Sequence, residues 1–421
     1  MNINSTCFMV ALLASLLTAC QSPQQTAAVE AGILAPGTKC SSVAASIDTE
    51  FPAGNIASCE FAKPNHVDIR IAPEDAPPIN CSPWYAFRVQ PKVTGEISLS
   101  LNYDACGHRY WPRISTDGKN WSIVPSTNMK LIYRIGQSDS EKGGIENSAK
   151  FSISLESGKA IFVSAQPIIA PATYDEWIGK LAQSDFVTTW ELQKSKEGRS
   201  IPAMSIKAKG SCPSKQIVLI GRQHPPEITG AYGLFSFVEM LTSDDPLAQK
   251  FRAEYETIVV PILNPDGVVR GHWRHNTGGV DLNRDWGPFT QPETQAIGAL
   301  LREIKNDPKR DLRFFVDFHS TWKDVFYTIP DEYPTDPAFF IRDWLAQLQT
   351  QMPEYRVNRN SNHEPGGPIS KAYVYETYGI PAVTFELGDQ TDPVLISDIA
   401  GEAAIAMIRT LLKTDLSSSK K

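Results

Sequence analysis

Two histidines and one glutamate in this chain have the types and spacing of a catalytic zinc site. His224 and Glu227 lie three residues apart, shortly after the apolar run 216–220, and His319 follows a second apolar run, 313–318. Catalytic zinc takes three nitrogen or oxygen ligands and leaves a fourth position to water, and two histidines with one glutamate is a usual set. Strands that end at the same sheet edge would bring these side chains together. The sequence therefore predicts one zinc ion per chain.

A His-x-x-Glu match alone also fits an ordinary helix start, where a first-turn glutamate favours the helix dipole. His272 and His275 form a rival pair, but the neighbouring Arg274 would repel a dication. Four further motifs lie in order around the predicted ligands: Asn264-Pro265-Asp266-Gly267, Trp273-Arg274-His275, Gly279-Val280-Asp281-Leu282-Asn283-Arg284 and Thr384-Phe385-Glu386-Leu387. The ordered set is far more specific than any single motif and favours the zinc interpretation.

This ordered set resembles the metallocarboxypeptidases of the carboxypeptidase A type over about residues 171 to 415. The resemblance implies zinc ligation by His224, Glu227 and His319, carbonyl polarisation by Arg274, a clamp on the substrate's terminal carboxylate by Asn283 and Arg284, and a general base in Glu386. The stretch 221–227 is most similar to the cytosolic-carboxypeptidase branch, whose members carry a small β domain in front of the catalytic one. Residues 84–125 resemble that leading domain.

The residue types support the same chemistry without the resemblance. Zinc lowers the pKa of a bound water to about 7, and Glu386 would take the proton that this water loses. Arg274 keeps its charge and suits an oxyanion. The guanidinium of Arg284, with the amide of Asn283, suits a free carboxylate. A carboxylate clamp beside a hydrolytic zinc predicts a peptide substrate with a free C-terminus, from which the last residue is removed.

The segment 366–371 should line the pocket for the departing side chain if the resemblance holds. Ile369 would favour an apolar residue, whereas Lys371 would favour an acidic one, as in the glutamate-removing branch. A solvated surface charge is the alternative for Lys371. The mobile tyrosine of the family is not evident. Its position falls near Asn362 or His363, and Tyr373, Tyr375 and Tyr378 are also near in sequence. This histidine is therefore a candidate substrate-binding donor, and packing near the last strands is the alternative.

The pattern of apolar residues and turns changes near residue 170, which predicts two domains. Residues 41–166 show short alternating runs bounded by Gly, Asp and Asn turns, which predicts a small antiparallel β-sandwich domain. Residues 171–415 predict an α/β fold, a mixed β-sheet covered by helices, after a linker at 167–171. Helices are expected at 232–241, 338–352 and 396–412, and strands at 217–219, 257–262, 314–318 and 382–385.

The first twenty residues predict the compartment. The apolar run 8–17 is too short to span a membrane and ends in Leu17-Thr18-Ala19-Cys20. This resembles a bacterial lipoprotein signal, which implies removal of residues 1–19, lipidation of Cys20, a flexible tether over 20–40, and a cell-envelope location facing the periplasm or the exterior. An ordinary cleaved signal is the alternative.

The other cysteines fit an exported chain. Four of them, Cys40, Cys59, Cys81 and Cys106, fall in the leading domain, and Cys212 is left over. An oxidising compartment predicts one or two disulfides among the four, with the pairing undetermined.

Composition sets wide limits. The 421 residues, 42% of them apolar, suffice for two domains, and the net charge of -7 gives no reason to expect nucleic acid. No protein partner is predicted.

Two other functions stay open. A zinc amidase acting on cell-wall peptides would use the same metal and base. A non-catalytic surface binding protein would usually have lost a ligand or the base, and here all are present.

Overall fold

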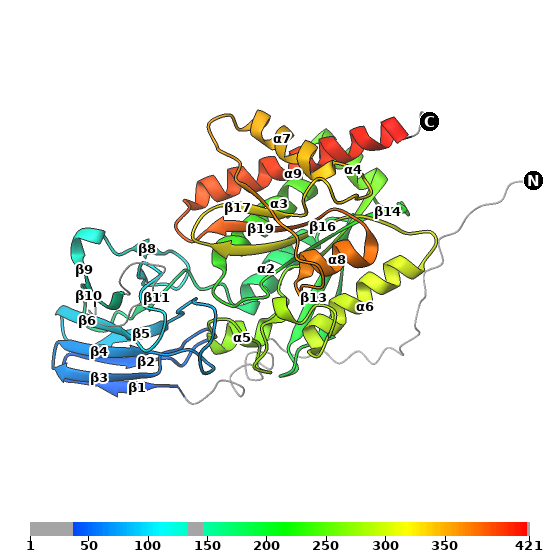
Figure 1. The fold of residues 1–421 in the computed structure, drawn as a ribbon. Helices are drawn as coiled ribbons and strands as arrows, with labels where there is room; N and C mark the ends of the chain where they lie inside the picture. Colours follow the sequence, from blue (N-terminus) through cyan, green and yellow to red (C-terminus); the bar gives the residue numbers. More distant parts are fainter. Residues whose placement is uncertain (1–36, 134–145, 419–421) are drawn as a thin grey trace, which may run out of the picture.

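A computed structural model describes residues 37–133 and 146–418. In these ranges a two-sheet β-sandwich precedes an eight-stranded mixed sheet with helices on both faces (Figure 1). The predicted fold class, a carboxypeptidase-like α/β domain behind a β-rich leading domain, is confirmed. The predicted signal peptide, Cys20 and most of the predicted tether lie outside the described residues.

The leading domain is built from two sheets whose strands come from residues 39–164. In spatial order the first sheet contains β1 (Lys39–Ser41), β2 (Ala45–Asp48), β5 (Ala86–Pro91), β11 (Ile161–Ser164), β7 (Arg113–Ser115) and β8 (Ser122–Ile123). The second contains β3 (Ser58–Lys63), β4 (His66–Ile71), β6 (Gly95–Tyr103), β10 (Glu146–Leu155) and β9 (Met129–Tyr133), and a 3₁₀ turn spans Ser126–Asn128. The pairing is antiparallel except between β4 and β6. β1 begins at Lys39, inside the range expected to be tether.

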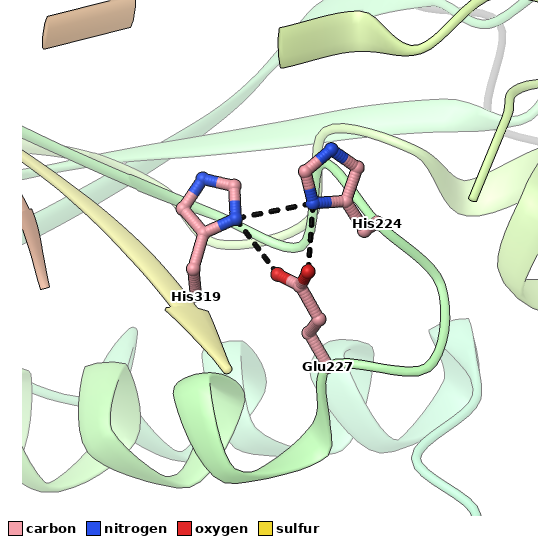
Figure 2. A group of neighbouring side chains, drawn as sticks. All are labelled: His224, Glu227 and His319. Atoms are coloured by element: carbon pink, nitrogen blue, oxygen red, sulfur yellow. Dashed lines mark hydrogen bonds and ion pairs between the residues drawn. The ribbon is translucent and has the colours of Figure 1, made fainter. Parts of the chain in front are cut away.

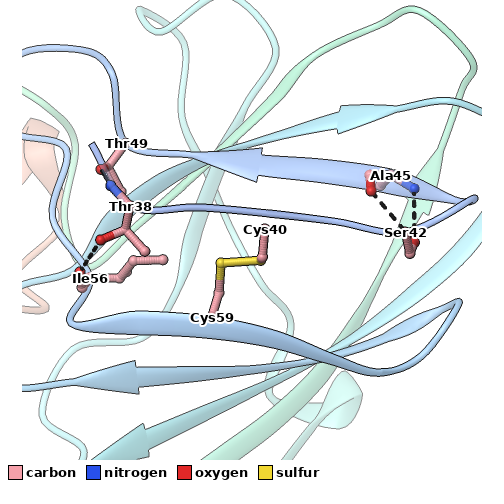
Figure 3. Close-up of a disulfide and its surroundings, with 7 residues drawn as sticks. All are labelled: Thr38, Cys40, Ser42, Ala45, Thr49, Ile56 and Cys59. Carbon is pink, nitrogen blue, oxygen red and sulfur yellow. Dashed lines mark hydrogen bonds between the residues drawn. A yellow bond between two sulfur atoms is a disulfide. The ribbon is translucent and has the colours of Figure 1, made fainter. Parts of the chain in front are cut away.

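Two disulfides stabilise the leading domain. Cys40 on β1 and Cys59 on β3 connect edge strands of the two sheets (Figure 3). Cys81 and Cys106 connect two loops that follow β4 and β6. The structure thus supplies a pairing that the sequence left undetermined. Cys212 lies outside both of these pairs.

The second domain centres on a mixed sheet. In spatial order it contains β12 (Val187–Lys194), β13 (Ser200–Ile206), β15 (Tyr255–Val260), β14 (Lys215–Gly221), β16 (Asp311–Thr321), β19 (Ala382–Gly388), β17 (Val325–Thr328) and β18 (Arg359–Ser361). The four central strands β15, β14, β16 and β19 run parallel to one another. These four are the strands that the apolar runs predict, and the structure shifts or extends their bounds.

Helices cover both faces of this sheet. They are α2 (Pro171–Leu181), α3 (Ile228–Thr242), α4 (Pro246–Glu254), α5 (Pro265–Arg270), α6 (Pro292–Asn306), α7 (Phe340–Gln351), α8 (Ser370–Tyr378) and α9 (Pro393–Ser418), with a 3₁₀ turn at Leu282–Arg284. The three predicted helices correspond to α3, α7 and α9. Helix α2 begins at Pro171, the last residue of the expected linker. Among the described residues no helix is both long and apolar enough to span a bilayer.

The central strands are buried on both faces, which places the candidate site. On β16, Phe314, Val316 and Phe318 pack into the core beneath α3, α7 and α9. Phe315 packs into the opposite core, beneath α6 and α8. Because side chains alternate along a strand, His319 points to the same face as Phe315. It does so near the carboxyl end of the sheet, where ligands bind in open α/β folds.

Candidate metal centre

The three predicted ligands converge at the carboxyl edge of the sheet (Figure 2). His224 lies in the turn after β14, Glu227 is the N-cap residue of α3, and His319 lies near the end of β16. Nδ1 of His224 lies 2.8 Å from Oε1 of Glu227, and Nδ1 of His319 lies 2.7 Å from Oε2. The two ring nitrogens lie 3.2 Å apart, and all three side chains are buried.

Local features of the sequence make this approach possible. The Arg222 guanidinium donates two hydrogen bonds, of 3.0 and 2.8 Å, to the carbonyl of Pro225 and so holds the turn that carries His224. In the first turn of α3, a Cβ on Gly230 would lie 2.5 Å from the carbonyl oxygen of His319. Only glycine lets α3 come this close to β16. The helix start and the strand end can therefore share one centre.

This donor set fits a zinc ion. Ligand atoms around a tetrahedral zinc with bonds of about 2.0–2.1 Å lie about 3.3 Å apart. The separations of 2.7 to 3.2 Å between the ligand atoms of His224, Glu227 and His319 are close to this value. Two imidazoles and one carboxylate are also a usual catalytic set that leaves a position for water.

Two aspartates hold the far side of the imidazoles. Oδ1 of Asp281 lies 2.9 Å from Nε2 of His224, and Oδ2 of Asp317 lies 2.8 Å from Nε2 of His319. Such carboxylates fix the ring orientation and leave Nδ1 free to bind a metal. Sequence reasoning missed both roles. The position of Asp317, two residues before His319 on a strand, was a usable signal, because both side chains point to one face.

Asp281 also links the metal centre to Arg274. Nε of Arg274 donates to Oδ2 of Asp281 at 2.8 Å, and its guanidinium lies 3.6 Å from Glu227. Burial raises the pKa of Asp281, but the positive charges and hydrogen bonds of His224 and Arg274 outweigh this and hold it well below its usual range. The carboxylate therefore stays ionised between His224 and Arg274.

Glu386 lies beside the ligands on the neighbouring strand. His319 on β16 and Glu386 on β19 are register partners in the parallel ladder, so both side chains point to the same face. Oε2 of Glu386 is buried and has no hydrogen-bond partner among the described residues. Burial, reinforced by the negative charge of Glu227, raises the pKa of Glu386 to about 7. A carboxylate with such a pKa can both take and give a proton near neutral pH.

The predicted ligands, Arg274 and Glu386 line one cavity of about 1300 Å³, which also includes the predicted carboxylate clamp. Asn283 is buried, and its Oδ1 accepts a hydrogen bond of 2.9 Å from the main-chain N–H of Ser370. Its amide NH₂ is the group left to donate. Arg284 is exposed, and its guanidinium donates to the main-chain carbonyl of Asn283. The two residues present their donors on one wall.

The predicted specificity residues have different environments. Ile369 and Lys371 line the cavity. Lys371 is only 3% exposed, so the surface-charge interpretation was wrong. Its ammonium group donates to the carbonyl of Thr328 and to both oxygens of Asn362, at 3.2, 2.6 and 3.0 Å. Desolvation lowers the pKa of Lys371 to about 8.

His363 lies outside the cavity lining. Its ring packs against Tyr333 and Tyr375, with Nε2 3.3 Å from Glu376. The structure therefore places it as a packed residue near the last strands. Tyr327, which sequence reasoning missed, lines the cavity instead, opposite Thr384 in the antiparallel pair of β17 and β19. Burial and the charge of Glu386 raise its pKa.

The leading domain forms part of the cavity wall. Cys81, Cys106, His108 and Arg109 line it together with residues 77–80. Nε of Arg109 lies 2.8 Å from Oδ2 of Asp389, three residues after Glu386. This wall could not be predicted from local sequence, because it depends on contacts between residues almost three hundred positions apart.

Comparisons with known proteins identify the family of each domain. The family model for zinc carboxypeptidase matches residues 174–403, and the model for the cytosolic carboxypeptidase N-terminal domain matches residues 47–139. Cytosolic carboxypeptidase 6 of Mus musculus is 25% identical over 293 residues, covering 65% of this chain and 52% of that protein. Its Caenorhabditis elegans counterpart is 31% identical over 227 residues, covering 50% and 46%. The chain spans about half the length of these curated relatives.

Solved structures share the fold. The metallo-carboxypeptidase from Burkholderia cenocepacia superposes with a TM-score of 0.69 at 17% identity, covering 89% of this chain and 99% of that one. The metallo-carboxypeptidase from Pseudomonas aeruginosa, in complex with (2-guanidinoethylmercapto)succinic acid, gives 0.67 at 19% identity, covering 87% and 99%. Both superpositions extend over the leading domain and the second domain.

Proposed function

Because the chain belongs to the zinc carboxypeptidase family, we propose that it removes the C-terminal residue of peptides in a zinc-dependent hydrolysis. One observation carries the proposal: the set His224, Glu227 and His319 shares a single cavity with a cationic clamp and with a carboxylate whose Oε2 has no hydrogen-bond partner in the described part of the chain. A hydrolytic centre beside a carboxylate-binding wall fits cleavage of the last peptide bond.

The roles of the residues follow from their positions. Zinc, when bound, supplies the Lewis acidity that lowers the pKa of a water to about 7. Glu386 accepts the proton of the attacking water and returns it to the departing amine. Arg274 donates to the carbonyl oxygen as negative charge develops there. Asn283 and Arg284 bind the terminal carboxylate through charge-assisted hydrogen bonds.

An acidic C-terminal residue is the preferred one in this proposal. Lys371 is a buried cation in the cavity, and the acceptors that it contacts are neutral oxygens of Thr328 and Asn362. A buried charge without a countercharge is costly. A glutamate or aspartate side chain of the substrate would replace Oδ1 of Asn362 and supply the missing negative charge. Ile369, on the same lining, contacts the apolar part of that side chain.

We also propose that Cys20 anchors the protein by lipid to a bacterial envelope membrane, facing the periplasm or the exterior. The support is the signal-like sequence before Cys20, together with the disulfides Cys40–Cys59 and Cys81–Cys106, which favour an oxidising compartment. Metabolic labelling with radioactive palmitate should mark the wild type and not Cys20→Ala. Label retained by the Cys20→Ala variant would contradict lipidation of Cys20.

The activity is tested with blocked dipeptides and tetrapeptides ending in Glu, Leu, Lys or D-Ala, with and without a zinc chelator. We expect zinc-dependent loss of one C-terminal residue, fastest for Glu. Glu386→Gln should reduce kcat by about 10²- to 10⁴-fold while one zinc stays bound, because only the proton acceptor is lost. Glu332→Gln, at an exposed position, is the matched control. Undiminished turnover in the chelator would contradict the proposal, and bound zinc without peptide turnover would favour the amidase.

A further inference from the structure

Three successive main-chain N–H groups of the loop that carries Arg274 point at one carboxylate, that of Glu74. The N–H of Trp273 donates to Oε2 of Glu74 at 2.7 Å. Those of Arg274 and His275 donate to Oε1 at 2.8 and 2.7 Å. Glu74 lies in the leading domain, directly after β4, whereas the loop belongs to the second domain. One domain therefore supplies an anion to the backbone of the other.

This arrangement is an anion-binding concavity of the kind formed by consecutive backbone N–H groups. Hydrogen bonds to a charged acceptor are roughly twice as strong as those between neutral groups, and three of them here act on adjacent residues. Arg274 is consequently held at both ends. Glu74 fixes its main chain, and Asp281 fixes Nε of its guanidinium at 2.8 Å.

Further contacts hold the same loop against the leading domain. Oδ2 of Asp75 lies 2.6 Å from Nδ1 of His275, and Nδ2 of Asn55 donates to the carbonyl of Gly271 at 2.7 Å. A Cβ on Gly271, which has a φ of +64°, would lie 2.7 Å from the carbonyl oxygen of Ala53. The loop thus contacts the leading domain along its length, and among residues 37–133 and 146–418 only Glu74 bonds the backbone of Arg274 itself.

Glu74, Asp75 and His275 also have the spacing of a metal site. Both oxygens of Glu74 already accept N–H groups, and Asp75 with His275 form a close pair. A cation there would have to displace the N–H donors, which repel it. The cluster fits an anchor for the loop better than a second metal centre.

We propose that Glu74 is a positioning residue for peptide hydrolysis, which holds the main chain of Arg274 so that the guanidinium is fixed where the substrate carbonyl oxygen develops charge. This inference rests on the proposed function, because the role of Arg274 does. It makes the leading domain a structural part of the active site rather than a separate module.

The test compares Glu74→Gln with Asn55→Ala. The amide of Glu74→Gln lacks the charge and presents an NH₂ to the N–H donors, so Arg274 loses its fixed position. We expect kcat to fall by about 10- to 100-fold, as for small misplacements of catalytic groups. KM should change less than about threefold, because Arg274 acts on the transition state and the clamp at Asn283 is untouched. Asn55→Ala removes an interdomain bond to the same loop and should leave kcat unchanged.

A double mutant separates positioning from general destabilisation. In an Arg274→Ala background, Glu74→Gln should cause no further decrease in single-turnover rate, because the two residues act as one unit. Independent, multiplicative losses would overturn the proposal. If Glu74→Gln does not fold, as judged by its thermal unfolding, Glu74→Asp takes its place, since it keeps the charge but shortens the reach.

Amide hydrogen exchange gives a readout that needs no activity. Amides 273–275 should be protected in the wild type, exchange faster in Glu74→Gln and stay protected in Asn55→Ala. Faster exchange with an unchanged kcat would show that Glu74 is only a structural contact and would overturn the proposal. A wild-type protein that hydrolyses no peptide would refute the proposed function, while unchanged exchange in Glu74→Gln would refute the anchoring by Glu74 itself.

Discussion

Asp317 holds the ring of His319 from the next position on the same face of β16, with Oδ2 2.8 Å from Nε2. Two other groups also fix this carboxylate: the side chains of Gln223 and Ser370 donate to the same oxygen. These bonds keep the Asp317 carboxylate beside Nε2 of the imidazole. Its Nδ1 is the atom presented to Glu227.

We expect Asp317→Asn to weaken zinc binding by about 10- to 100-fold, the usual effect of losing such a carboxylate behind a metal-binding histidine. Competition with a chromophoric chelator measures the affinity. Asp343→Asn, which removes an exposed carboxylate, is the control and should bind zinc as the wild type does. An affinity unchanged by Asp317→Asn would show that Asp317 does not support the ligand.

Lys371→Met should alter the choice of substrate rather than the chemistry. The buried ammonium group is lost, so the ratio of kcat/KM for peptides ending in Glu to those ending in Leu should fall by about 10- to 100-fold, as expected for a hydrogen bond to a charged group. Steady-state kinetics on the two peptides measures it. Lys305→Met on the exposed face of α6 should leave the ratio unchanged. An equal loss on both peptides would argue against a specificity role.

The same lysine predicts a pH dependence. Desolvation lowers the pKa of Lys371 to about 8, so the side chain is charged below this pH and neutral above it. KM for a peptide ending in Glu should therefore rise as the pH increases through about 8, relative to KM for one ending in Leu. The measurement is the pH profile of this ratio. In Lys371→Arg the guanidinium keeps its charge and the profile should be flat; a step at the same pH in that variant would rule Lys371 out as its origin.

The two disulfides should affect stability alike and activity differently. Replacing either pair by serine opens a loop of similar length, with sequence separations of 19 and 25 residues. Each change should lower the free energy of unfolding by about 2–4 kcal/mol, measured by urea denaturation. Only Cys81 and Cys106 line the cavity, so only their replacement should raise KM. A raised KM after replacement of Cys40 and Cys59 would contradict this assignment.

The convergence of His224, Glu227 and His319 could be predicted because their residue types and their positions after apolar strands are local properties of the sequence. The burial of Lys371 could not be predicted, because a lysine is exposed by default. It becomes evident only when the fold brings Thr328 and Asn362 to its ammonium group. Asp317 was accessible in principle from strand alternation. Glu74 was not, because its function depends on a loop 200 residues away.

Under the proposed function, the wall contributed by the leading domain would restrict which C-termini can reach the site. The predicted ligands are at most 4% exposed, and they line a cavity to which the leading domain contributes Arg109, Cys81 and Cys106. A C-terminus packed into its own domain cannot enter this space without local unfolding. Frayed tails, which are common at chain ends, can thread in as single extended strands. Whether the last few residues of a protein are folded or disordered, and not merely which residues they are, would decide whether the protein is trimmed.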